Sequence, residues 1–128
     1  MLARLRWKAV LRDIVIVYGL TALGGYLSGL AAAAVGDSRV QLVGSALFAT
    51  LGFAISAWLT RENRPLHLIG VSIGVWLASA FNMLAGIPVS AWLVSIVFLP
   101  PVMLAGAGLT LLIERTTGRA TESDTSPL

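Results

Sequence analysis

The fold is decided by PLHLIGVSIGVWLASAFNMLAGIPVSAWLVSIVFLPPVMLAGAGLTLLI, which runs from Pro65 to Ile113 without an Asp, Glu, Lys or Arg. A helix needs about 20 apolar residues to cross the hydrocarbon core of a bilayer. This stretch is too long for one crossing and fits two, divided at the turn-like AGIPVS of residues 85–90. It therefore predicts two membrane-spanning helices, over residues 66–85 and 89–113.

Two further charge-free runs precede this stretch, from Ile14 to Gly36 and from Val40 to Thr60. They predict spans over 14–35 and 40–59, which gives a four-span transmembrane domain over 14–113. A chain in lipid must satisfy its own backbone hydrogen bonds, and these runs lack the alternation of barrel strands. We therefore expect an all-α integral membrane four-helix bundle, whose short loops produce antiparallel, up-and-down hairpins.

The basic residues predict how the chain is oriented. Eight of the nine Lys and Arg residues precede the first span, lie between the second and third, or follow the fourth, whereas Arg39 lies in the first loop. Cytoplasmic segments carry this excess, so both termini should be cytoplasmic. The Arg-, Ala- and Gly-rich composition indicates a GC-rich bacterial genome, and with four spans we expect a multi-pass protein of the bacterial cytoplasmic (inner) membrane. The net charge of +3 then reflects topology, and no nucleic-acid partner is expected.

The regions outside the spans are polar. Residues 1–13 form a basic amphipathic cytoplasmic segment, predicted to be a short interfacial helix or an inner extension of the first span. Arg4, Lys8 and Arg12 recur every four residues and therefore share a helical face. This face is expected to contact lipid headgroups, or simply to anchor the topology. Residues 114–128 form a polar cytoplasmic tail that is expected to be disordered.

Small residues recur at helical spacing in the first and third spans. In lipid, helices associate where small side chains let their backbones approach. These faces have two interpretations: internal packing of the bundle, or contact with a protein partner or a second copy of the chain. The residues concerned are Gly24, Gly25, Ser28, Gly29, Gly70, Gly74 and Ala78.

Pro100 and Pro101 lie near the middle of the fourth span. Proline lacks a backbone N–H, so the pair should kink this helix and deprive two carbonyls one turn earlier of their usual partners. The kink either shapes the bundle or opens a crevice or pore at mid-membrane depth, because broken helices mark the substrate sites of transporters. Thr50 and Asn82 are the polar side chains expected to share such a crevice with the two prolines.

The sequence offers little chemistry. There is no cysteine, and the single histidine, His67, is interpreted as an interfacial residue, with ligation of a pigment metal as the less favoured alternative. The acidic residues, Asp13 and Glu114 among them, are placed at span ends. This leaves no charge at depth for proton-coupled transport. We predict no catalytic residues, no metal site, no enzyme activity and no cofactor, although a lipid or pigment could lie between helices.

Two functions remain open from the sequence. The first is an accessory, structural or assembly subunit of a larger membrane complex, bound to its partners through small-residue helix faces. The alternative is a small oligomeric channel or carrier for an ion or small solute, built around the proline break.

Overall fold

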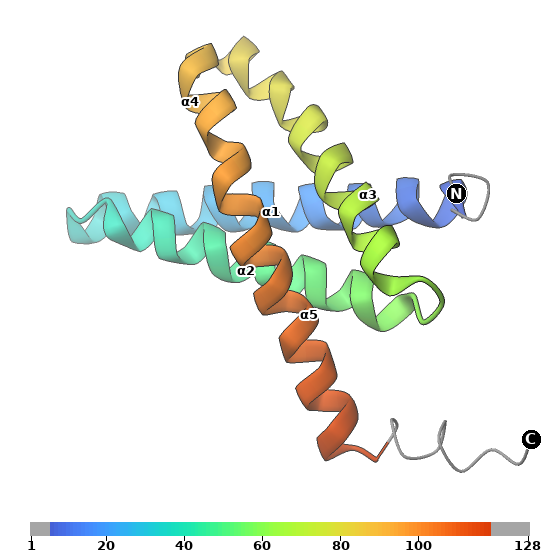
Figure 1. Cartoon of the computed structure of the whole chain (residues 1–128). Helices are drawn as coiled ribbons and strands as arrows, with labels where there is room; N and C mark the ends of the chain where they lie inside the picture. Colours follow the sequence, from blue (N-terminus) through green and yellow to red (C-terminus); the bar gives the residue numbers. More distant parts are fainter. Residues whose placement is uncertain (1–5, 119–128) are drawn as a thin grey trace, which may run out of the picture.

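The computed structural model describes residues 6–118, which form helices joined by short turns (Figure 1). The elements are α1 (Trp7–Val35), α2 (Arg39–Leu59), α3 (Arg64–Ala78), the 3₁₀ helix η2 (Ser79–Ala85), α4 (Val89–Ser95), the 3₁₀ helix η3 (Ile96–Phe98) and α5 (Leu99–Thr116). Together α3 and η2 form one span, and α4, η3 and α5 form another. Each of the four resulting segments is long and apolar enough to cross a membrane, which confirms the predicted all-α four-helix membrane fold.

The turns between the spans follow from a few local residues. The first helix ends at Gly36, which adopts φ +76° and donates its N–H to the carbonyl of Ala32. Gly86 ends η2 in the same way, with φ +93°. Glycine adopts this left-handed conformation without steric cost. Pro65 lies in the first turn of α3, where its missing N–H has no helical partner to lose.

The first helix is longer than the charge-free run that predicts it. It is continuous from Trp7 to Val35, so residues 7–13 extend the first span inward. Asp13 therefore lies two turns inside a helix, on the buried face that also carries Val10 and Val17. The predicted headgroup residue Arg4 and residues 119–128 of the predicted tail lie outside the described residues, and α5 continues through the first part of that tail to Thr116.

The fourth span is broken one turn before its prolines. Pro100 and Pro101 lie in the first turn of α5, where the absence of an N–H is tolerated. A proline ring clashes with the carbonyl four residues earlier, and those carbonyls belong to Ile96 and Val97, which form η3. The N–H of Leu99 donates to the carbonyl of Ile96, so that carbonyl gains a 3₁₀ bond. The predicted break in the fourth helix is confirmed.

The two helical hairpins cross each other (Figure 1). The α1–α2 hairpin is closely paired along its length, α3 packs on α1, and α5 packs on α2. We call the "charged end" the side where α1 begins, the α2–α3 turn (Thr60–Asn63) lies and α5 ends. The other end of each hairpin is its tip, and the two tips, at residues 36–38 and 86–88, diverge widely in Figure 1.

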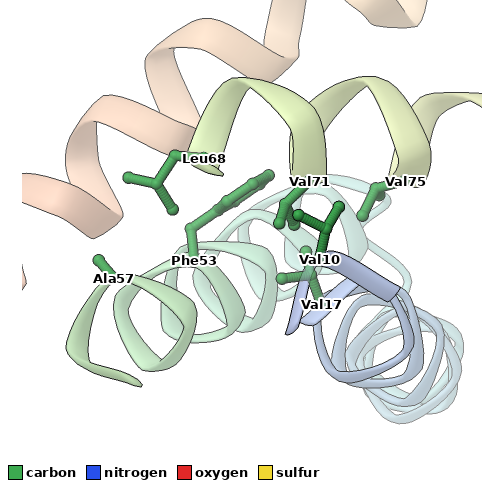
Figure 2. Close-up of a cluster of buried hydrophobic side chains, with 7 residues drawn as sticks. All are labelled: Val10, Val17, Phe53, Ala57, Leu68, Val71 and Val75. Atoms are coloured by element: carbon green, nitrogen blue, oxygen red, sulfur yellow. The ribbon is translucent and has the colours of Figure 1, made fainter. Parts of the chain in front are cut away.

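The buried apolar core lies where α3 packs on the α1–α2 hairpin (Figure 2). It is formed by α1, α2 and α3, and partly buried side chains of α5 pack against it. Its members are Val10, Val17, Phe53, Ala57, Leu68, Val71 and Val75. Phe53 is the largest of them and is fully buried. The core thus joins the second hairpin to the first half of α1 and the second half of α2.

The second hairpin is tied together near its own tip by two tryptophans. The rings of Trp76 and Trp92 stack with centroids 4.2 Å apart and planes 10° from parallel. Each indole N–H donates to the other residue's carbonyl, at 3.2 Å from Trp76 and 3.1 Å from Trp92. This reciprocal pair fixes α4 against α3.

Candidate functional site

The carboxylate of Asp13 is fully buried and has three side-chain hydrogen-bond partners from three helices. Arg12 Nε donates to its Oδ1 at 2.7 Å. Ser56 Oγ donates to its Oδ2 at 2.8 Å, and His67 Nε2 lies 2.8 Å from the same oxygen. An ionised carboxylate only accepts hydrogen bonds, so Nε2 of His67 carries the proton of that bond. The group joins three helices through one side chain.

Each partner reaches Asp13 because of its place on its helix. Asp13 lies between Val10 and Val17 on the face of α1 that turns toward the core. Ser56 is in the last turn of α2 and His67 in the first turn of α3, so the α2–α3 turn brings both to the same depth. We call Asp13, Ser56 and His67 the "Asp13 cluster". Asp13 and His67 are both buried within the protein, because α1 begins earlier than the charge-free run and α3 packs over it.

The order of bonds in the Asp13 cluster determines its chemistry. In a nucleophilic triad the histidine takes the proton of the serine hydroxyl. Here Ser56 and His67 both bond the carboxylate, and the histidine does not accept the serine proton as it does in a triad. Toward the membrane interior the neighbouring buried side chains are Val17 and Phe53, which are hydrocarbons and cannot relay a proton. The cluster therefore has no polar continuation across the described span, and its geometry suits a fixed structural or binding role.

A cavity of about 290 Å³ opens at the charged end beside the Asp13 cluster. It lies between the start of α1 and the α2–α3 turn. Arginines approach it from both elements, and His67 lies at its wall. The residues that line it are Arg6, Ala9, Arg12, Leu59, Thr60, Arg61, Glu62, Asn63 and His67. The walls combine three guanidinium groups with one exposed carboxylate, so the cavity is positively charged.

A second ion pair closes the charged end. Arg64 at the start of α3 and Glu114 near the end of α5 form two hydrogen bonds, at 2.7 and 3.3 Å. Both side chains are largely buried, at 18% and 11% exposure. Arg64 Nε also donates to the carbonyl of Thr60 at 3.1 Å. The pair therefore connects the α2–α3 turn to the last span. The sequence places both charges at span ends but does not indicate that they pair with each other.

The small residues of the first span lie mostly against α2. Gly24 faces Phe48, Ser28 faces Gly44, and Gly25 faces Ser45 at an ordinary contact distance. Gly29 faces the side-chain amide of Gln41 in the same way.

The small residues of the third span have different environments from one another. Gly74 receives Ile14 of α1, so this position lies within the chain's own helix packing. Gly70 and Ala78 are half-buried. A side chain added at Gly74 would meet Ile14, just as one added at Gly24 would meet Phe48.

The four residues predicted to share a crevice are not brought together. Pro100 lines an apolar crevice of about 180 Å³ between α3 and α5, whereas Pro101, Thr50 and Asn82 do not line it. Thr50 Oγ1 donates to the carbonyl of Ala46 at 2.8 Å, and Asn82 Oδ1 accepts from the Tyr18 hydroxyl at 3.4 Å.

The crevice beside Pro100 offers few free polar groups. Its Ser72 hydroxyl points to the sulfur of Met103 at 3.0 Å, and the Trp76 indole N–H is already bonded to Trp92. The remaining lining side chains, among them Ile69 and Ile73, are apolar. This geometry suits a lipid chain better than a hydrated solute.

The predicted headgroup residues have separate environments. Lys8 and Arg12 are exposed and flank a shallow basic hollow together with Arg6 and Trp7. The guanidinium of Arg12 also bonds Asp13, so it serves the interior as well as the surface.

Comparison with protein-family models, with curated proteins and with solved structures finds no match to this chain. Four apolar helices of membrane-spanning length identify it as a small multi-pass membrane protein. Any more specific function has to be argued from its own residues.

Proposed function

We propose that the protein is a non-enzymatic accessory or assembly subunit of a larger membrane complex, and that partner helices pack on the tip of its second hairpin. The observation that supports this is a continuous segment, residues 79–98, that contains no buried residue. The segment is uncharged and mostly apolar, with Asn82 and three serines as its polar side chains. Leu84 is 86% exposed and Val97 67% exposed.

Exposed apolar side chains alone indicate only contact with lipid, because helices in a bilayer gain little from the hydrophobic effect. The backbone of this segment supplies the stronger argument. It contains a seven-residue 3₁₀ helix, η2, and a second 3₁₀ turn, η3. Runs of 3₁₀ helix beyond three or four residues are uncommon, since their hydrogen bonds have poorer geometry. A 3₁₀ helix pairs its backbone groups internally but with weaker bonds, so cover by another protein segment would stabilise it.

Within the described chain, little covers these two segments. The first hairpin diverges from the second at this end (Figure 1), and the Tyr18–Asn82 hydrogen bond is the long-range side-chain bond that reaches η2 from α1. A partner helix, or a second copy of the chain, would supply the missing cover. The alternative of a channel or carrier has less support, because the crevice beside Pro100 is apolar and separate from Thr50 and Asn82.

Site-specific photo-cross-linking in the native membrane tests the proposal. A photoreactive residue at Phe81 or Phe98 should give protein adducts, because both side chains are exposed on the uncovered segment. The matched control is Leu112, an equally exposed apolar residue of α5 near the charged end. Lipid adducts alone at all three positions, together with recovery of a lone monomer after gentle extraction, would overturn the proposal.

A further inference from the structure

The cavity at the charged end carries an inference that is independent of the assembly role. It is the place where three arginines converge from two elements: Arg6 and Arg12 from the start of α1, and Arg61 from the α2–α3 turn. Its volume of about 290 Å³ is at the lower limit for ligand pockets, so it suits a small ligand or a headgroup. Guanidinium groups bind carboxylates and phosphates through paired, charge-assisted hydrogen bonds.

The backbone around the cavity adds to its positive potential. Both α1 and α3 begin at this end, neither has an acidic residue in its first turn, and neither is capped by a side chain. The start of a helix carries a partial positive charge and unpaired N–H groups, which favour a bound anion. Glu62 is the one exposed carboxylate at the cavity, and Asp13 beneath it is already bonded to Arg12 and His67. Arginines therefore outnumber carboxylates there.

His67 connects the cavity to the Asp13 cluster. Its side chain is almost fully buried and its Nε2 is used by Asp13, yet the residue lines the cavity. No hydrogen bond to Nδ1 is found within residues 6–118, and the ring lies at the cavity wall. The open space beside His67 is this cavity. Asp13 thus fixes the His67 ring at the cavity wall, where Nδ1 would donate to an anion when the ring carries both protons.

We propose that this cavity binds a phosphate-bearing group, which is either the headgroup of an anionic phospholipid or a soluble phosphate ester. Arg6 and Arg61 supply the principal contacts, because neither side chain has a hydrogen bond within the described chain. Asp13 holds Arg12 and His67 at the wall of the cavity, behind Arg6 and Arg61. This site differs from the predicted Arg4–Lys8–Arg12 face, since it requires the α2–α3 turn as its second wall.

The experiment uses the full chain in lipid nanodiscs. One arm includes phosphatidylglycerol as a minor component among phosphatidylcholine and counts the phosphatidylglycerol molecules retained by the released protein in native mass spectrometry. The other arm uses phosphatidylcholine alone and measures thermal stabilisation by inorganic phosphate. The test variant is Arg6→Gln with Arg61→Gln. The control is Arg39→Gln with Arg115→Gln, which loses the same charge at positions that do not line the cavity.

We expect the test variant to bind at least one probe roughly tenfold more weakly than the control does, because two charge-assisted hydrogen-bonding groups are lost. Retained phosphatidylglycerol identifies a lipid headgroup, and stabilisation by phosphate identifies a soluble ester. Circular dichroism establishes that the variant is folded, and Arg61→Lys, which keeps the charge without the paired donors, should bind with intermediate affinity. Equal binding of both probes by the test and control variants, or binding of neither, overturns the proposal.

Discussion

Asp13 is the residue at which three helices meet. Its carboxylate accepts hydrogen bonds from Arg12 and Ser56 and is bonded to His67, with all three distances between 2.7 and 2.8 Å. A buried charge is tolerated only when it is paired and fully hydrogen-bonded. Removing the acceptor would leave two buried polar groups without a partner, whereas removing one donor leaves the carboxylate with two others.

This asymmetry gives a prediction. Asp13→Ala should lower the free energy of unfolding by about 3–5 kcal/mol, the range for breaking a buried charge pair. Ser56→Ala should cost about 1 kcal/mol, because it removes one hydrogen bond. Glu62→Ala, which removes an exposed carboxylate, is the control and should change stability by less than about 0.5 kcal/mol. Reversible unfolding in mixed detergent micelles measures all three, and equal stability of the Asp13 and Ser56 variants would contradict the role assigned to Asp13.

The burial of Asp13 could be predicted from the sequence, whereas its hydrogen-bond partners could not. Asp13 follows Val10 by three residues and precedes Val17 by four, so the periodicity could have placed it on the apolar face of an extended first helix. Its pairing with His67 could not be predicted in this way, because 54 positions separate the two residues. That contact depends on how α3 docks on α1, which local periodicity does not determine.

At the scale of elements, the packing of α5 on α2 depends on one glycine. A side-chain carbon at Gly106 would lie 2.9 Å from the backbone nitrogen of Ala54 and from the backbone oxygen of Thr50. One turn later, Thr110 Oγ1 donates to the carbonyl of Ala54 at 2.7 Å, which holds the same two helices together. Backbone atoms cannot rotate away as a side chain can, so any side chain at this position must separate the helices.

We therefore expect Gly106→Ala to destabilise the protein by about 1–3 kcal/mol, as overpacking does in other cores. Gly108→Ala is the matched control on the same helix, because a side-chain carbon there meets nothing within 4 Å. Alanine is the better helix former, so this variant should be neutral or slightly stabilising. Thermal unfolding of both variants in one detergent provides the comparison, and a neutral Gly106→Ala would mean that α5 packs elsewhere.

The elements themselves were predictable from charge-free runs and turn residues, because both follow from local chemistry. The break at Pro100 and Pro101 was predictable for the same reason. The sequence did not indicate that α3 would finish as the 3₁₀ helix η2, since residues 79–85 carry no proline or glycine that would require it. It also did not predict that the hairpin tips diverge, which is a property of how the two hairpins cross.

At the scale of the whole molecule, the structure groups the basic residues as the sequence does. The start of α1 and the α2–α3 turn line one cavity, and the Arg64–Glu114 pair connects the start of α3 to the end of α5. The two hairpin tips lie away from it and carry Arg39 as their basic residue. Because basic segments stay in the cytoplasm during insertion, the charged end should face the cytoplasm.

The absence of cysteine from the sequence makes this orientation directly measurable. Single cysteines at Ser38 and Ser90, which lie at the two tips, should react in intact cells with a thiol reagent that cannot cross the inner membrane. Cysteines at Glu62 and Thr116, on the charged end, should react only after the membrane is permeabilised. All four residues are exposed, so a difference in labelling reports the side of the membrane and not burial within the protein. Labelling of Glu62→Cys and Thr116→Cys before permeabilisation, with Ser38→Cys and Ser90→Cys protected, would reverse the orientation and place the arginine-lined cavity outside the cytoplasm.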